Sequence, residues 1–131
     1  ALGRVMPPYK QFAYFLREYS LQHFRDRDIE KPYLVEHYNA DTGEPLSDEA
    51  DYNHSFYIDL IVSHVAGIQI GEDGIRFDPV DIGLDYFRLE NVKIRGDYYT
   101  VSYKKEDCMD PRATDIPVGY NVYKNNSKID I

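Results

Sequence analysis

The sequence predicts an α+β protein in which two helices are followed by a small antiparallel β layer. Two observations support this fold class. Apolar residues fall at helical spacing in the first half of the chain, and strand-like alternation takes over after Gly67. At 131 residues the chain is long enough for one domain with a buried core. We therefore predict a helical region over residues 1–67 and an antiparallel β region over residues 68–131.

The first helix is predicted over residues 8–27. The residues that recur there at helical spacing are Phe12, Phe15, Leu16, Tyr19 and His23. Pro7 and Pro8 suit the first turn of this helix, where a missing N–H costs nothing. This face is strongly aromatic, so a large partner surface is needed to bury it. Three partners fit this pattern: the β half of the chain, neighbouring helices outside it, or a second copy that self-associates through this helix.

A polar loop from Glu36 to about Asp51 separates the two predicted helices, and its prolines and glycine forbid regular structure through much of it. A loop of this length in a compact domain is usually functional or disordered. The second helix is predicted from about Asn53, with Gly67 as its left-handed terminator. The residues on its apolar face are Phe56, Leu60, Ile61, His64 and Val65.

Turn signals divide the second half of the chain into short strands. The turns are predicted at residues 72–74, 95–97 and 125–126, where glycine, aspartate and asparagine gather. The segments that these turns flank are predicted as strands at residues 75–77, 86–94, 98–103 and 118–123, with a final short strand after residue 126. Strands joined by turns this short pair antiparallel.

The charge and the residue types exclude several classes of function. The 15 basic and 23 acidic residues give a net charge of −8, which repels nucleic acid. The longest apolar-leaning stretch, residues 56–70, contains Asp59 and His64, so no segment is predicted to cross a membrane. Cys108 is the sole cysteine, and His23, His37, His54 and His64 show no ligand spacing. We therefore expect no metal site and no cofactor.

One stretch of the polar loop gathers groups that suit chemistry. Glu36 ends an extended segment and is followed by His37, Tyr38 and Asn39, after which Asp41-Thr42-Gly43 supplies a tight turn. A second polar and aromatic cluster, Tyr52-Asn53-His54-Ser55, opens the second helix. A loop and a helix start that present such groups together can form one wall of a polar cleft.

Three segments carry a resemblance to a known enzyme group: EHYNADTGEP, DYNHSFYIDLIVSHVAGI and FDPV…LDYFRLENVKIRGDYYTVSY. Together they resemble the C-terminal end of the inverting glycoside hydrolases with an (α/α) six-hairpin toroid. That group includes the processing α-glucosidase and mannosylglycerate hydrolase relatives, with trehalases as more distant kin. The resemblance covers about residues 12–123 and is most specific in the run that starts at Glu36. It implies that residues 1–67 are the last helices and the catalytic-base loop of such a toroid.

The resemblance also implies roles for individual residues. Glu36 opens the matching motif, which makes it the general base that activates water. Tyr38 and Asn39 then position sugar hydroxyls or stabilise the loop, and His54 lines the sugar pocket or caps the second helix. No residue here matches the family's general acid, which lies upstream. The resemblance therefore implies a missing N-terminal part of the same enzyme, an oligosaccharide or glycoside substrate, and an isolated chain without activity.

Two other classes of function stay open. A non-catalytic carbohydrate-binding or accessory β module would explain the β half and the 13 tyrosines without a missing acid. A stand-alone structural protein would hide its aromatic helix face by self-association. Titration of the isolated chain with oligosaccharides separates the first alternative from a hydrolase, and light scattering on the same chain tests the second.

Overall fold

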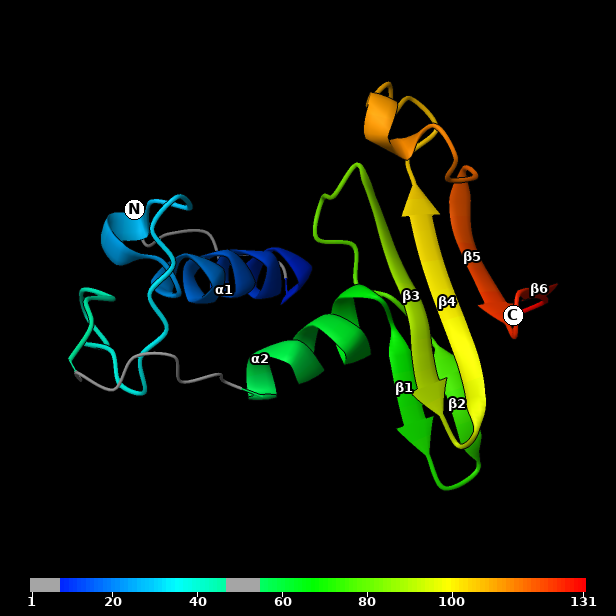
Figure 1. The fold of residues 1–131 in the computed structure, drawn as a ribbon, viewed down its shortest axis with the longest axis horizontal. Coiled ribbons are helices and arrows are strands. Elements are labelled where there is room, and N and C mark those ends of the chain that lie inside the picture. The colour runs from blue at the N-terminus through cyan, green and yellow to red at the C-terminus, as the bar shows by residue number, and fades with distance from the viewer. Residues whose placement is uncertain (1–7, 47–54) are drawn as a thin grey trace. The chain divides into compact units, whose positions relative to one another are not determined.

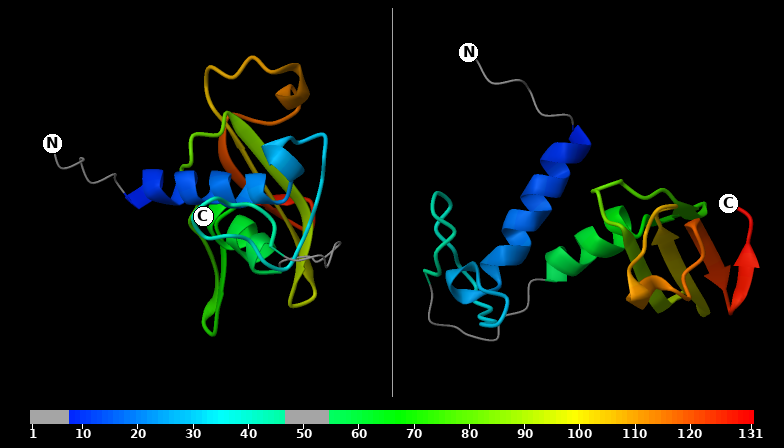
Figure 2. Two further views of the ribbon diagram at one scale, coloured as in Figure 1. Left: turned by 90° about the vertical axis from the view of Figure 1, so that its left-hand side faces the viewer. Right: turned by 90° about the horizontal axis from the view of Figure 1, so that it is seen from above.

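The computed structural model describes residues 8–46 and 55–131. By its internal contacts the chain divides into two compact units, Ala1–Leu60 and Ile61–Ile131. Figures 1 and 2 show the elements of each unit as ribbons. The division between the units precedes the domain boundary at residues 67 and 68 that the sequence suggests, because the last helical turns contact the β half.

The first unit contains helix α1 (Pro8–Gln22), a 3-10 turn η1 (Arg25–Arg27) and helix α2 (Ser55–Leu60). Helix α1 is shorter than the sequence predicts, because the chain turns away after Gln22 although the apolar spacing continues. Asp26 and Arg27 adopt left-handed backbone angles, with φ of 56° and 59°. The Arg25 N–H then donates to the Lys31 carbonyl at 2.8 Å, which brings the following segment back beside the helix end.

Helices α1 and α2 meet through polar and aromatic contacts. The hydroxyls of Ser20 and Tyr57 lie 2.7 Å apart. The ring of Tyr57 lies edge-on to Tyr19 at a centroid distance of 5.3 Å, and 4.7 Å from the ring of His23. Among the described residues of this unit, the buried side chains are Leu16, His23, Val35 and Leu60. The first unit therefore has a small apolar core.

The second unit opens with a π-helical turn η2 (Ile61–Val65) and is otherwise mostly β. A two-stranded antiparallel sheet is followed by a four-stranded antiparallel sheet in the order β3-β4-β5-β6, with a 3-10 turn η3 (Pro111–Ala113) in the connection after β4 (Figure 1). The strands are β1 (Ile68–Gly71), β2 (Gly74–Phe77), β3 (Tyr86–Ile94), β4 (Asp97–Lys104), β5 (Gly119–Lys124) and β6 (Ser127–Ile129).

The core of the second unit lies on one face of the four-stranded sheet. Val101 of β4 and Val122 of β5 are cross-strand partners and are fully buried. Burying each of these side chains stabilises the fold by about 1.5–3 kcal/mol relative to exposure. Ile68 of β1 joins the same cluster, and the ring of Phe77 in β2 lies 5.8 Å from that of Tyr99. The two sheets therefore share one core, which gives this unit most of the buried apolar residues.

Tight turns fix the register of the four-stranded sheet. Arg95 and Gly96 join β3 to β4 with φ of 51° and 89°, and Asn125 and Asn126 join β5 to β6 with φ of 49° and 69°. Positive φ at both central residues matches the right-handed twist of antiparallel strands. Asn91, with φ of 57°, forms a bulge in β3 between Leu89 and Val92. The strands and hairpins predicted from these turn signals are confirmed.

The expectation that the helical half is the end of an (α/α) toroid is wrong. The described residues contain two α-helices, of 15 and 6 residues, against six strands in two antiparallel sheets. A toroid needs successive long helices that pack in hairpins. Here the second helix changes to a π-helical turn at Ile61, and the chain enters a strand at Ile68. The described chain is mostly β. Apolar residues at helical spacing predicted two helices, but two helices do not make an all-helical fold.

Gly67 ends the helical segment as the sequence predicts, with φ of 78°. Its surroundings are also crowded: a Cβ atom at this position would lie 2.4 Å from the backbone nitrogen of Pro79. The Gly67 carbonyl accepts a hydrogen bond from the Asp78 N–H at 2.8 Å, and the His64 carbonyl accepts one from the Val80 N–H at 2.8 Å. The glycine therefore lets the segment after β2 pack directly on the helix end.

Among the helices of residues 8–46 and 55–131, none has both the length and the apolar character needed to cross a bilayer.

Candidate functional site

The segment from Glu36 to Leu46 closes on itself as a compact loop, which we call the Glu36 loop. Backbone hydrogen bonds run from the Asn39 N–H to the Glu44 carbonyl and from the Gly43 N–H to the Asn39 carbonyl, both at 2.8 Å. The Leu46 N–H donates to the His37 carbonyl at 2.9 Å. These bonds fix the loop although it contains no regular strand.

The Asn39 side chain holds the turn of the Glu36 loop. Its Oδ1 accepts hydrogen bonds from the N–H groups of Asp41 at 2.8 Å and Thr42 at 3.0 Å. Asparagine side chains commonly replace a backbone acceptor in this way. Gly43 follows with φ of 75°, a conformation that glycine adopts without strain. These contacts of Asn39 stabilise the loop, and its contact with substrate stays a prediction.

Glu36 follows the buried residue Val35 and is partly exposed to solvent. Val35 is fully buried, whereas 40% of the Glu36 side chain is exposed. The Tyr38 hydroxyl accepts a hydrogen bond from the Val35 N–H at 3.3 Å, which ties the loop to this buried residue. His37 Nδ1 lies 3.8 Å from Glu36 Oε2. The carboxylate is therefore accessible to water on a loop whose backbone is fixed on both sides.

A polar cavity of about 310 Å³ lies beside the turn of this loop, and we call it the loop cavity. The C-terminal half of α1, the turn η1 and residues 40–45 form its walls. The lining combines four carboxylates and one guanidinium with the amide of Gln22 and with apolar and aromatic side chains such as Leu21 and Phe24. The charged residues of the lining are Glu18, Asp26, Arg27, Asp41 and Glu44. Glu36, Tyr38 and Asn39 are not part of it.

An ion pair organises one wall of the loop cavity. Arg27 Nη1 lies 2.6 Å from Glu18 Oε2, and Arg27 Nη2 donates to Glu18 Oε1 at 3.0 Å. These hydrogen bonds hold the pKa of Glu18 below its ordinary value. Arg27 and its neighbour Asp26 have a left-handed backbone, a conformation that costs non-glycine residues energy and is often found at functional sites. Sequence reasoning missed these residues, because neither is a glycine and nothing local marks the turn.

The histidines do not gather at the Glu36 loop. His54, predicted beside the sugar, lies outside the described residues. His23 is buried, its Nδ1 lies 3.3 Å from the Ser20 carbonyl, and its ring contacts Tyr19 and Tyr57. Burial raises the pKa of the neighbouring Tyr19. Within residues 8–46 and 55–131, no cluster of three histidine, cysteine or acidic side chains is placed to hold a metal ion.

Comparison with known proteins finds no matching family model, no similar curated protein and no similar solved structure. The residues and geometry of the Glu36 loop and the loop cavity are therefore the basis for a proposed function.

Proposed function

We propose that this chain is part of a glycoside hydrolase that cleaves O-glycosidic bonds with inversion, and that Glu36 is its general base. One observation supports this proposal most strongly. The side chains of the motif that starts at Glu36 hold their own loop together, and they leave the Glu36 carboxylate half-exposed next to the buried Val35. A base that must reach water needs both exposure and a fixed position.

The proposed reaction is a single displacement. Glu36 removes a proton from a water molecule while the water oxygen attacks the anomeric carbon, and the bond from that carbon to the leaving oxygen breaks. A second carboxylic acid donates a proton to the leaving oxygen. In inverting enzymes the two carboxyl groups lie roughly 6.5–9.5 Å apart, which leaves room for the water.

The acid is proposed to lie in another part of the enzyme, outside this chain, since no residue here matches its motif. Asp59 lies in the short helix α2 and is better explained as a solvated helix residue. The isolated chain is accordingly expected to bind substrate weakly and not to cleave it. Tyr38 and Asn39 are proposed to act mainly by positioning Glu36, and His54 remains a proposed substrate contact.

The loop cavity suits the hydroxyl groups of an oligosaccharide or glycoside. Its volume of about 310 Å³ falls at the lower end of the range for small-molecule pockets, roughly 300–1,000 Å³. Carboxylates such as Asp41 and Glu44 accept hydrogen bonds from hydroxyl groups, and Arg27 donates them. The cavity shares residues 40–45 with the Glu36 loop, so a sugar bound there would rest against the same loop.

The test uses the intact enzyme with Glu36→Gln, which removes the basic oxygen and keeps the size of the side chain. We expect the rate of glycoside hydrolysis to fall by about 10²–10⁴-fold, as for loss of a general base, while the affinity for substrate stays within about threefold. Glu30→Gln is the matched control, because Glu30 is exposed and carries the same charge. Hydrolysis by Glu36→Gln at the rate of the control would rule out the base assignment.

A second function is favoured by one specific observation. Glu36 does not line the loop cavity, so this cavity could bind sugar without any chemistry, as in a non-catalytic carbohydrate-binding module. Calorimetric titration of the isolated chain with oligosaccharides separates the two. Two results together would favour the binding module. The isolated, inactive chain would bind oligosaccharide with a dissociation constant at or below about 0.1 mM, and the intact Glu36→Gln enzyme would keep its rate of hydrolysis.

A further inference from the structure

Three aromatic rings form one row across three neighbouring strands of the second unit. Phe87 in β3 is the cross-strand partner of Tyr103 in β4, and Tyr103 is the partner of Tyr120 in β5. The rings of Phe87 and Tyr103 lie 5.9 Å apart between centroids. Tyr103 shares a face with Tyr99 and Val101, because residues two apart in a strand point the same way. The row therefore continues the core face of the sheet toward the end of β4.

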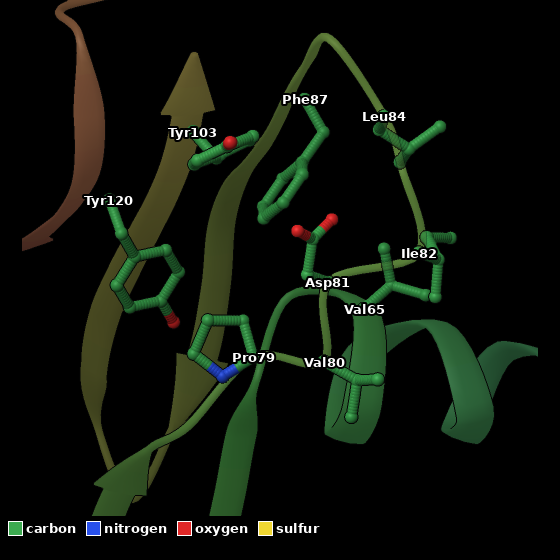
Figure 3. A pocket seen from close by; sticks show the side chains of 9 residues that line it. All are labelled: Val65, Pro79, Val80, Asp81, Ile82, Leu84, Phe87, Tyr103 and Tyr120. Carbon is green, nitrogen blue, oxygen red and sulfur yellow. The ribbon is translucent and has the colours of Figure 1, made fainter. Parts of the chain in front are cut away.

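A cavity of about 140 Å³ lies over this row, and we call it the aromatic cavity (Figure 3). Its opposite wall consists of Val65, residues 79–82 and Leu84. That wall is held in place by the two hydrogen bonds that join the segment after β2 to His64 and Gly67. The volume resembles that of an apolar cavity of about 150 Å³ that accepts benzene. The aromatic cavity therefore has room for about one six-membered ring.

Asp81 supplies a charge to a lining that is otherwise aromatic and aliphatic. Figure 3 shows its carboxylate turned toward the ring of Phe87. Asp81 Oδ1 accepts a hydrogen bond from the Gly83 N–H at 2.8 Å, which orients the carboxylate. Within the described residues, none of the ion pairs involves Asp81. Residues 78–85 contain three aspartates, of which Asp85 pairs with Lys105 at 3.5 Å, so Asp81 and the nearby Asp78 supply the negative charge beside the cavity.

The remaining polar groups of the cavity are few. The Tyr120 hydroxyl already donates a hydrogen bond to the Ala66 carbonyl at 2.5 Å. Burial raises the pKa of Tyr120 to about 12, and the charge of Asp78 adds to the rise, so this hydroxyl stays neutral. A sugar needs several hydrogen-bond partners, which this lining does not offer. A neutral hydrocarbon would leave the exposed Asp81 carboxylate without a partner.

We propose that the aromatic cavity binds a small organic cation, an ammonium group carried on a compact apolar body of about one ring. The faces of Phe87, Tyr103 and Tyr120 attract a cation through their quadrupoles, and the Asp81 carboxylate pairs with it. The apolar walls take up the rest of the ligand. This site lies wholly in the second unit and does not depend on the proposed hydrolase function.

The test titrates the whole chain with cyclohexylammonium and follows backbone and aromatic NMR signals. We expect saturation in the millimolar range, with the largest shifts at Gly83, Phe87 and Tyr103. Cyclohexanol has the same shape without the charge and should bind at least about fivefold more weakly. Asp81→Asn keeps the acceptor oxygen for Gly83 and should weaken cation binding about tenfold, which corresponds to about 1.4 kcal/mol.

Asp73→Asn is the matched control, since it removes an equal charge from the exposed turn between β1 and β2 and should leave the affinity unchanged. Tyr103→Leu removes one aromatic wall and should also weaken cation binding, which tests the ring contribution separately. Three results would overturn the proposal: no saturation up to about 50 mM cyclohexylammonium, equal binding of cyclohexanol, or full affinity in Asp81→Asn.

Discussion

At the scale of single residues, Asn39 and Glu36 divide two tasks within one motif. Asn39 uses its side-chain oxygen to bind the amides of Asp41 and Thr42, whereas Glu36 keeps a half-exposed carboxylate. A loop that is stabilised by its own side chains can present a reactive group without regular structure behind it. Asn39 therefore fixes the geometry of the loop, and Glu36 remains the proposed catalytic group.

This division predicts different behaviour for two variants of Asn39. Asn39→Ala removes the acceptor, so hydrogen exchange at the Asp41 and Thr42 amides should accelerate and stability should fall by about 0.5–1.5 kcal/mol. In the intact enzyme kcat should fall about tenfold with little change in KM, because the proposed base, Glu36, is less well positioned. Asn39→Asp retains an acceptor oxygen and should restore both properties. Unchanged amide exchange in Asn39→Ala would contradict the positioning role.

The sequence revealed the polar residues of the Glu36 loop but not their partners. Glu36, Tyr38 and Asn39 stand out because carboxylate, phenol and amide groups gather after an extended segment. Which backbone amides Asn39 binds depends on how the loop closes, and the spacing alone leaves loop stabilisation and substrate contact equally open. Nothing in the sequence marks Asp26 and Arg27 as a left-handed turn, since residues other than glycine rarely adopt positive φ.

At the scale of elements, Gly67 connects the end of a helix to the wall of the aromatic cavity. Gly67→Ala places a Cβ in a left-handed conformation and against the backbone of Pro79. The left-handed conformation alone should cost about 1–2 kcal/mol, and the backbone contact adds to this. We expect a lower unfolding midpoint in urea.

Gly83→Ala is the control for Gly67→Ala, because its φ of 84° is equally left-handed but no atom lies within 4 Å of the position that a Cβ would take. We expect this control to lose stability through the backbone conformation alone, and so to unfold at a higher urea concentration than Gly67→Ala. Equal losses in both variants would show that the close packing at Gly67 contributes nothing.

Elements set by local chemistry were predictable, and elements set by distant packing were not. The turns at Arg95-Gly96 and Asn125-Asn126 specify hairpins by their own backbone preferences, and both hairpins form. The end of α1 depends on a return of the chain to Lys31, so the apolar spacing overran it by several residues. The toroid was wrong for the same reason, since its existence depends on how many helices pack together and not on the spacing within one.

At the scale of the whole molecule, buried apolar residues are distributed unequally between the two units. The second unit has a shared core around Val101 and Val122, whereas the first unit buries few side chains among its described residues. Helix α1 leaves Tyr9, Tyr14 and Phe15 at least half-exposed. At 3.6 residues per turn these three side chains point to different sides of the helix, and Phe15 is the one that belongs to the aromatic face predicted from the sequence.

The exposure of Phe15, which belongs to the predicted aromatic face of α1, leads to a prediction of self-association through this helix. Phe15→Lys should shift the concentration dependence of the sedimentation coefficient toward the monomer without loss of stability, because Phe15 is 52% exposed. Met109→Lys adds the same charge at a residue that is 90% exposed in the second unit, and it should leave association unchanged. A wild-type chain that stays monomeric at millimolar concentration, or an equal effect of both variants, would exclude association through α1.

The aromatic cavity could not be predicted from the sequence. Its walls come from η2, the segment after β2 and three strands, and these segments are distant along the chain. Phe87, Tyr103 and Tyr120 each fit a strand pattern in which aromatics are common, so none marks a site. Only the register of β3, β4 and β5 places them in one row.

The proposed function depends above all on a water molecule that Glu36 activates and that attacks the sugar in a single step. The decisive experiment is proton NMR of the first product formed by the intact enzyme, recorded before the anomers equilibrate, for the wild type and for Glu36→Gln. We predict a product of inverted anomeric configuration from the wild type and no product from Glu36→Gln in the same interval. A product that retains the configuration of the substrate, or an undiminished yield from Glu36→Gln, would refute the proposed mechanism.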